Sequence, residues 1–178
     1  MGDLGERLAR GDRSAFAELY DGCAHRVHHY LVVQLGSRDD ADDVLQETFA
    51  RLARTSDKLA AVENLTGYVF AAARNEAARL LAQKSRERRQ RGAEPAAADL
   101  FCEAAGDDLV AREAAEALWA ALARLGADER EVVELKTYGG LTLREIAEVT
   151  GAPPGTVATR YRTAIARLRG WLKKTCHE

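Results

Sequence analysis

Residues 141–157 carry the signals for two short helices joined by a tight turn, and no other stretch of the chain restricts the fold as strongly. Thr142 and Glu145 have the spacing of a capping box, in which each side chain bonds the other residue's backbone N–H at a helix start. Gly151 follows where a turn needs positive φ, and Pro154 suits the first turn of the next helix. The pattern predicts a helix-turn-helix.

The second helix of this motif is the one expected to read DNA. Val157, Tyr161 and Leu168 recur at helical spacing and predict its buried face. The other face offers hydroxyl and guanidinium groups, which bond base edges and phosphates in a major groove. The residues of the motif that we expect to contact DNA are Thr142, Arg144, Thr156, Thr159, Arg160, Arg162, Thr163 and Arg167. A helical hairpin with an arginine-rich surface is the alternative interpretation.

Helical periodicity continues through the rest of the chain except over residues 92–108. Period-two alternation never persists, so we expect an all-α protein. Before this interruption the expected helices run from Asp12 to Gly36, 39–54 and 65–89, with 55–63 as a connecting loop. After it they run over 109–125, 128–138, 142–150 and 154–172. The prediction is therefore two small helical domains, residues 1–91 and 109–178, joined by a flexible acidic linker, residues 92–108.

The formal net charge of −2 conceals an alternation of basic and acidic stretches. Residues 61–91 and residues 138–178 each hold seven Lys or Arg against three acidic residues, whereas residues 92–137 hold eleven acidic residues against four basic ones. A nucleic acid needs only a local positive surface, so the net negative charge does not exclude such a ligand. Solvated helix faces are the other explanation of the same pattern.

The cysteines bear on the compartment in which the chain works. Cys23, Cys102 and Cys176 are odd in number and form no CxxC pair, which fits a reducing cytosol better than a disulfide framework or a zinc ribbon. The sequence shows no leader-like start and no apolar run of bilayer length, so we expect a soluble, cytoplasmic protein without a membrane segment of its own.

The sequence offers little support for a catalytic site or a metal site. Cys23 lies close to His25, His28 and His29, but one helix face does not easily supply four tetrahedral ligands, so we expect no metal and no cofactor. The sequence has no Gly-rich phosphate loop, nucleophile elbow or carboxylate pair in a catalytic context. We therefore expect no enzymatic activity.

Further runs of residues carry a resemblance to a known family. In the first half they are Asp40-Ala-Asp-Asp-Val-Leu-Gln-Glu-Thr-Phe49, Asn64-Leu-Thr-Gly-Tyr-Val-Phe70 and Ala73-Arg-Asn-Glu-Ala77. In the second half they are Arg130-Glu-Val-Val-Glu-Leu135, Gly140-Leu-Thr-Leu-Arg-Glu-Ile-Ala147 and Gly155-Thr-Val157. Over residues 10–90 and 110–172 the chain resembles the extracytoplasmic-function sigma factors of bacterial RNA polymerase. The helix-turn-helix alone is shared with many response regulators, whereas the run 40–49 is far more specific.

The resemblance implies a factor that directs core RNA polymerase to promoters. The acidic helix would dock on the clamp helices of the polymerase's largest subunit, through Asp40, Asp43, Val44, Gln46, Glu47 and Phe49. The melted single strand of the downstream promoter element would contact Asn64, Tyr68, Arg74, Asn75, Lys84, Arg86, Arg88 and Arg89. The helix-turn-helix would read the upstream element as duplex. The resemblance also implies an anti-sigma factor as a partner.

Two rival functions belong to other classes. The first is a stand-alone helix-turn-helix regulator whose N-terminal helices sense a signal or dimerise, and the second is a helical adaptor that binds only protein. The run 40–49 discriminates among the three functions, because only the sigma interpretation gives it a role.

Overall fold

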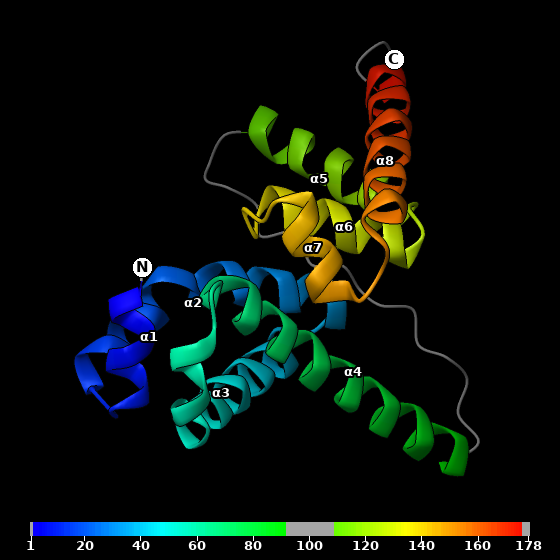
Figure 1. Ribbon diagram of the computed structural model, residues 1–178. Coiled ribbons are helices and arrows are strands. Elements are labelled where there is room, and N and C mark those ends of the chain that lie inside the picture. Colours follow the sequence, from blue (N-terminus) through cyan, green and yellow to red (C-terminus); the bar gives the residue numbers. More distant parts are fainter. Residues whose placement is uncertain (1, 92–108, 176–178) are drawn as a thin grey trace.

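Helices account for nearly all of residues 2–91 and 109–175, the residues that the computed structural model of this chain describes. Neither range contains a strand, and the expected all-α class is confirmed. The N-terminal half consists of α1 (Gly2–Ala9), α2 (Arg13–Leu35), α3 (Arg38–Arg54), the 3₁₀ helix η1 (Ser56–Ala61) and α4 (Leu65–Arg91). The C-terminal half consists of α5 (Leu109–Ala123), α6 (Ala127–Thr137), α7 (Leu143–Thr150) and α8 (Pro154–Thr175) (Figure 1). The expected linker, residues 92–108, lies outside the described residues, so the domain division there stays a prediction.

Helices α2, α3 and α4 pack against one another and form the core of the N-terminal half. Asp12 caps the start of α2 by accepting a hydrogen bond from the backbone N–H of Ser14, and Gly36 ends it with a φ of 66°. Both helix limits agree with the sequence prediction. Inside the core, the rings of Tyr30 and Phe70 meet edge to face with their centroids 5.7 Å apart, which fixes α2 against α4.

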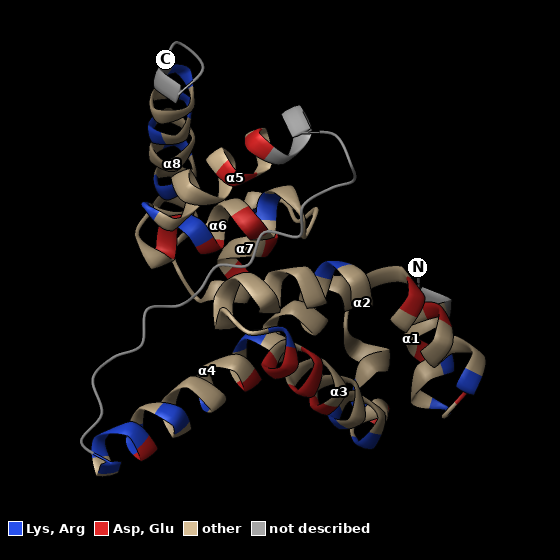
Figure 2. Ribbon diagram, turned by 180° about the vertical axis from the view of Figure 1, so that it is seen from behind, with Lys and Arg blue, Asp and Glu red and all other residues tan. Residues whose placement is uncertain are grey.

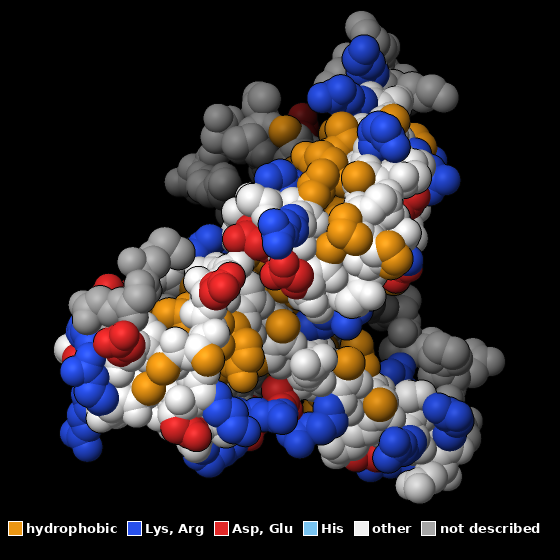
Figure 3. All heavy atoms as spheres, in the orientation of Figure 1, with side chains coloured by type: hydrophobic (Ala, Val, Ile, Leu, Met, Phe, Trp, Pro, Cys, Tyr) orange, Lys and Arg blue, Asp and Glu red, His pale blue; other side chains and the backbone are white. Residues whose placement is uncertain are grey.

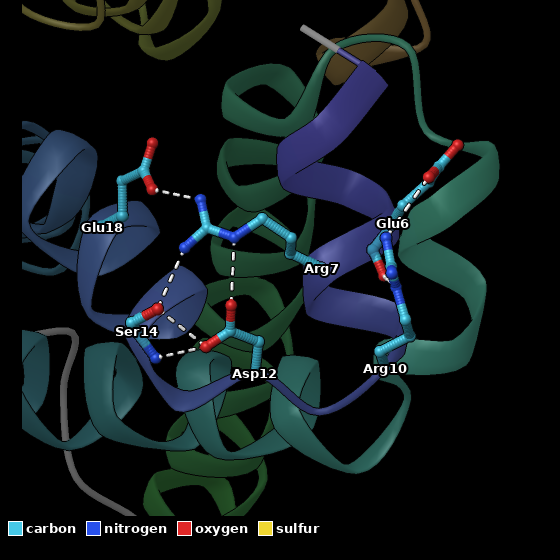
Figure 4. A network of polar contacts seen from close by, with 6 residues as sticks. All are labelled: Glu6, Arg7, Arg10, Asp12, Ser14 and Glu18. Atoms are coloured by element: carbon cyan, nitrogen blue, oxygen red, sulfur yellow. Dashed lines mark hydrogen bonds and ion pairs between the residues drawn. The ribbon is translucent and has the colours of Figure 1, made fainter.

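Helix α1 was not predicted from the sequence, which gives no long apolar stripe there. Arg7 attaches it to α2, donating to Asp12 over 3.0 Å, to Glu18 over 2.8 Å and to Ser14 over 3.0 Å (Figure 4). The hydrogen bonds from Ser14 and Arg7 lower the pKa of Asp12 to about 2. Helix α1 also packs on η1, which occupies most of the predicted loop 55–63.

The predicted helix-turn-helix is present as α7 and α8. Thr142 and Glu145 form the full capping box at the start of α7, and Gly151 ends that helix with a φ of 69°. Pro154 is the first residue of α8, as expected. On α8, Val157, Ala164 and Leu168 are buried and Tyr161 is half-buried, so the face predicted to point inward does so.

The two halves are in direct contact, which the sequence did not predict. One apolar cluster runs from the N-terminal core, including Phe70, into the C-terminal half, where it includes Leu135, Leu141 and Ile146. Helix α7 lies on α4, and α6 touches α2 (Figure 1). A second cluster joins α5, α6 and α8 within the C-terminal half. The helix-turn-helix is thus held against the N-terminal helices.

Candidate nucleic-acid interface

The acidic side chains of α3 line a depression between α3 and α4. Asp40, Asp43 and Glu47 line it from α3, and Glu76 lines it from α4. Viewed from behind, the acidic stretch of α3 lies beside α4 (Figure 2). This concentration of negative charge, placed at a helix surface, suits a partner helix that carries arginines.

The other residues of the expected polymerase set lie in different surroundings. Val44 is 6% exposed and belongs to the core. A contact with polymerase at this position would therefore have to be made by the neighbouring side chains of α3. Gln46 is exposed, while Phe49 is half-buried and packs against Tyr20 with the ring centroids 4.8 Å apart. Glu47 accepts a hydrogen bond from Arg54 over 2.6 Å. The surface of α3 between Asp39 and Glu47 is therefore mainly acidic and amide in character.

Glu76 is a functional candidate that the sequence analysis missed. It is 4% exposed and forms ion pairs with Arg51 of α3 and, over 2.9 Å, with Arg79 of α4. A buried carboxylate needs such partners, and the pair with Arg51 also links α3 to α4. The sequence pattern could have indicated that Glu76 is buried, because it falls on the apolar stripe of the helix with Ala73 and Ala77.

The residues expected to bind the downstream element form two groups on α4. Its last turns carry Lys84, Arg86, Arg88 and Arg89, and this basic end projects from the rest of the molecule (Figure 2). The other group lies at the opposite end of the helix, near the C-terminal half. There, Tyr68 is 37% exposed, and Asn75 is exposed.

Asn64 and Arg74, in this second group, are engaged by carboxylates of the C-terminal half. Arg74 donates to both carboxylate oxygens of Glu131, over 2.7 and 3.3 Å, and these bonds raise the pKa of the guanidinium. Asn64 donates to Glu145 over 2.7 Å, while its own carbonyl oxygen accepts from the N–H of Gly67 at the start of α4. The structure thus gives both side chains contacts that the sequence did not foresee.

A pocket of about 300 Å³ separates α4 from α7 beside these contacts. Tyr68 lines it on one side, and Glu145 and Glu148 line it on the other. Figure 3 shows acidic side chains gathered over the helices of the C-terminal half that face the N-terminal half. A phosphate backbone would meet electrostatic repulsion here as long as the two halves stay together.

The expected DNA-binding face of the helix-turn-helix is divided between exposed and paired side chains. Thr156, Thr159 and Arg162 are exposed, and Arg162 donates weakly to Thr159 over 3.4 Å. Arg160 and Arg167 instead pair with acidic residues of α6. Arg160 bonds Asp128, and Arg167 donates to Glu129 over 2.7 Å.

The remaining members of this set lie at or near α7, except for Thr163. Thr142 uses its side chain in the capping box, and Arg144 lies 3.6 Å from Glu148 one turn further on. Thr163 is half-buried on α8. Arg162, Thr159 and Thr156 therefore offer the most accessible donors of the motif.

Helices α2 and α6 bring an ionisable pair together between the halves. Glu134 is fully buried, and neither of its carboxylate oxygens has a hydrogen-bond partner within the described residues. Burial raises the pKa of Glu134 to about 7, although the nearby Arg130 opposes this change. His29 places its Nδ1 3.5 Å from Glu134 and stacks on Tyr138 with the ring centroids 3.8 Å apart.

The cysteine and histidines of α2 do not converge on a common point. The thiol of Cys23 is buried, donates to the carbonyl oxygen of Leu19, and has its pKa raised to about 11 by burial. His28 lies 3.1 Å from Asp42, away from the pair described above. Within residues 2–91 and 109–175, no three His, Cys, Asp or Glu side chains are grouped so that they could hold a metal ion.

In the part of the chain that the structure describes, none of the helices combines the length and the apolar character that a bilayer requires.

Comparison with known proteins identifies both halves. The family model of sigma-70 region 2 matches residues 19–87, and the model of sigma-70 region 4 matches residues 115–168. The RNA polymerase sigma factor RpoE of Cereibacter sphaeroides is 32% identical over 89% of this chain and 86% of its own length. The sigma factor SigK of Mycobacterium ulcerans is 27% identical over 93% of this chain and 90% of its own.

Solved structures share the fold. The sigma factor RpoE from Bartonella quintana, solved with the anti-sigma factor NepR, superposes with a TM-score of 0.68 at 24% identity, over 83% of this chain and 89% of that one. CnrH, solved with the cytosolic domain of CnrY, superposes with a TM-score of 0.70 at 21% identity, over 97% of each chain. The sequence relatives, together with the two matched regions, show that the chain belongs to the extracytoplasmic-function (ECF) family of RNA polymerase sigma factors.

Proposed function

We propose that this sigma factor binds core RNA polymerase, directs it to promoters and takes part in transcription initiation there. The observation that carries the proposal is the match to region 2 and region 4 in one chain. A stand-alone helix-turn-helix regulator accounts for the second match only. The factor supplies no catalytic group of its own, and it works in the cytoplasm because polymerase and promoters are there.

Polymerase binding is assigned to the acidic surface of α3. Asp43 and Gln46 are exposed there, and Asp40 and Glu47 border the same depression. The ion pair between Glu76 of α4 and Arg51 of α3 helps to hold this helix in place. A partner helix rich in arginine would find carboxylates spaced along about two turns of α3.

Promoter binding is divided between the two halves. The exposed face of α8, with Arg162 and Thr159, is assigned to the major groove of the upstream element. Melted downstream DNA is assigned to Asn64 and to α4, where Tyr68 and Arg74 would meet bases and backbone and the basic end of the helix would meet phosphates. Arginine and lysine binding to phosphates makes this contact sensitive to salt.

An anti-sigma factor is the proposed regulatory partner. RpoE of Bartonella quintana was solved with the anti-sigma factor NepR, and its chain has the same helical fold. Such a partner would act by covering the polymerase-binding or promoter-binding residues named above.

The proposal is tested by measuring binding to purified core polymerase by size-exclusion chromatography. Wild-type protein is expected to elute with core, while Gln46→Ala/Glu47→Ala should elute separately, because it removes exposed polar groups from the docking surface. Glu113→Ala is the matched control, since it removes an exposed carboxylate from α5 of the other half. Wild-type protein that is folded and yet fails to elute with core would contradict the proposal.

A further inference from the structure

The 3₁₀ helix η1 has few interactions of its own that would fix its position. The hydrogen bonds of a 3₁₀ helix are poorer in geometry than those of an α-helix, and no side chain caps the start of η1. Leu59 is buried, whereas the other residues of η1 are half-buried or exposed. A segment with so little buried surface opens readily unless another element holds it.

Helix α1 is the element that holds η1. Leu8 of α1 and Leu59 of η1 are fully buried and belong to one apolar cluster. The two backbones also approach closely, because a Cβ added at Gly5 would lie only 2.8 Å from the carbonyl oxygen of Leu59. Among the described elements, α1 alone packs extensively on η1. The position of η1 therefore depends on α1.

Helix α1 depends in turn on Arg7. A helix of eight residues is marginal by itself and needs tertiary contacts. The guanidinium of Arg7 provides them by donating from Nε to Asp12, from Nη1 to Glu18 and from Nη2 to Ser14, over 3.0, 2.8 and 3.0 Å (Figure 4). Asp12 is also the N-cap of α2, so Arg7 joins α1 directly to the first turns of that helix.

Arg10 offers a natural comparison with Arg7. It lies immediately after α1, and its guanidinium bonds the side chain of Glu6 over 3.4 Å and the carbonyl oxygen of the same residue over 3.2 Å. In Figure 4, Arg7 is directed toward α2, whereas Arg10 lies beside Glu6 on α1 itself. The two arginines carry the same charge, but only Arg7 connects α1 to the rest of the fold.

Both α1 and η1 border the site assigned to the melted downstream strand. Asn64, which belongs to that site, follows the last residue of η1 by three positions. Leu4 of α1 and Asn64 also line one pocket of about 360 Å³, together with Leu19 of α2 and Thr66 of α4. A displacement of α1 would therefore change both the segment that leads into Asn64 and one wall of the pocket beside it.

We propose that Arg7 is a positioning residue for the downstream promoter site, because it fixes α1 on α2 and thereby holds η1 and the pocket wall beside Asn64. Arg7 acts without touching DNA, since its donors are engaged by acceptors on and before α2. The inference rests on the proposed function, because downstream DNA is the ligand of this site. Loss of Arg7 lowers the fraction of molecules in which the site is formed, and the apparent affinity falls with that fraction.

The first test compares Arg7→Ala with Arg10→Ala in holoenzyme assembled with purified core polymerase. The probe is a fluorescein-labelled single strand that carries the downstream element of a promoter mapped by run-off transcription. Both variants lose one positive charge, so simple electrostatic attraction predicts equal effects. Arg7→Ala should bind the strand about fivefold or more weakly than Arg10→Ala. Equal affinities, with wild-type holoenzyme active, would overturn the inference.

Two further readouts distinguish positioning from a general loss of folding. Arg7→Ala should bind core polymerase and the duplex upstream element as wild type does, because α3 and α8 lie outside the contact of α1 with η1. Arg7→Lys should recover part of the affinity for the single strand, since it keeps the charge and loses the planar fork of donors. A parallel fall in binding to all three ligands would overturn the positioning role.

A second pair of variants reverses the electrostatic expectation. Asp12→Asn preserves a good N-cap for α2 but loosens the ion pair with Arg7. Asp21→Asn, which removes an exposed carboxylate from the same helix, is the control. Removing a negative charge favours DNA binding in both, yet Asp12→Asn should bind the single strand about twofold or more weakly than Asp21→Asn. Equal or tighter binding by Asp12→Asn would contradict the inference.

Hydrogen exchange of the free protein separates this inference from the proposed function. The N–H groups of Lys58 and Val62 bond carbonyl oxygens three residues earlier and report on η1. They should exchange about tenfold faster in Arg7→Ala, and faster to a smaller extent in Asp12→Asn, than in Arg10→Ala. Equal exchange in the three variants would overturn the inference. The measurement needs no polymerase, so a failure of core binding would count against the proposed function alone.

Discussion

The ammonium group of Lys84 on α4 lies 2.5 Å from a carboxylate oxygen of Asp40 on α3. The two residues belong to surfaces assigned to different ligands, since Asp40 is expected to face polymerase and Lys84 to face downstream DNA. Asp43, on the same side of α3, is exposed to solvent. The acidic surface therefore contains one carboxylate that is paired within the protein, Asp40, and one that is exposed, Asp43. Substituting each in turn distinguishes their effects on stability and on polymerase binding.

Asp43→Asn should weaken binding to core polymerase by about threefold or more, because it removes an exposed charge from the docking surface. Its stability in urea should equal that of wild type. Asp40→Asn should weaken core binding too, and should also lower the free energy of unfolding by less than about 1 kcal/mol, since Lys84 is 41% exposed. Fluorescence titration with core and urea denaturation provide the two readouts. Wild-type affinity in Asp43→Asn would count against this assignment of α3.

Arg162 and Arg160 should differ in their effects on upstream DNA. Arg162 is exposed, whereas Arg160 is bonded to Asp128 of α6. Arg162→Ala should therefore weaken binding of promoter duplex by roughly fivefold or more, the range expected for loss of one base or phosphate contact. Arg160→Ala should weaken it less and should lower thermal stability instead. The measurement is holoenzyme binding to a duplex upstream element, and a larger loss in Arg160→Ala would refute the assignment.

Gly5 and Gly22 form a matched pair for testing how α1 supports η1. A Cβ added at Gly5 would lie 2.8 Å from the carbonyl oxygen of Leu59 in η1, whereas one added at Gly22 would meet no atom within 4 Å. Gly5→Ala should destabilise the protein by about 1–3 kcal/mol, because backbone must move to admit the methyl group. Gly22→Ala, inside α2, should stabilise it by about 0.5–1 kcal/mol. Thermal unfolding measures both, and equal changes would contradict the packing of α1 on η1.

Glu134 should make stability depend on pH. Its ordinary pKa of 4.5 is raised to about 7 in the folded protein, so between these values the folded state holds a proton that the unfolded chain has released. The free energy of unfolding should therefore fall as pH rises from about 5 to about 7, by an amount on the order of 2 kcal/mol, and then level off.

Glu134→Gln is the variant that tests this dependence, because the amide keeps the shape of the side chain and removes its titration. Its unfolding free energy should lose the fall between pH 5 and 7, and at pH 8 it should exceed that of wild type. Chemical denaturation across this pH range gives the comparison. A fall of the same size in Glu134→Gln would assign the effect to other groups.

The elements that the sequence predicted well are those with local signals. Asp12 and Gly36 limit α2, and Thr142, Glu145 and Gly151 limit α7, because caps and left-handed turns are determined by neighbouring residues. The inward face of α8 followed from helical spacing alone. Helix α1 has no comparable apolar pattern, and its position depends on the distant contacts of Arg7, so periodicity did not reveal it.

The sequence predicted which residues belong to the candidate site. It did not predict which other residues those side chains contact. The sequence assigned Asn64 and Arg74 to DNA binding, but their partners Glu145 and Glu131 lie 81 and 57 positions away along the chain, respectively. Pairings over such separations depend on how the two halves pack, which no local pattern encodes. Glu131 lies in the predicted helix 128–138 and in a run that carries the family resemblance, but no local pattern paired it with Arg74, so its place at the interface was found in the structure.

Run-off transcription with purified core polymerase on fragments of the source genome tests the central claim most directly. Adding the wild-type protein should produce new discrete transcripts, and Gln46→Ala/Glu47→Ala should abolish them while Glu113→Ala leaves them unchanged. Folded wild-type protein that yields no transcripts beyond those of core alone would contradict the account of this chain as a promoter-directing sigma factor.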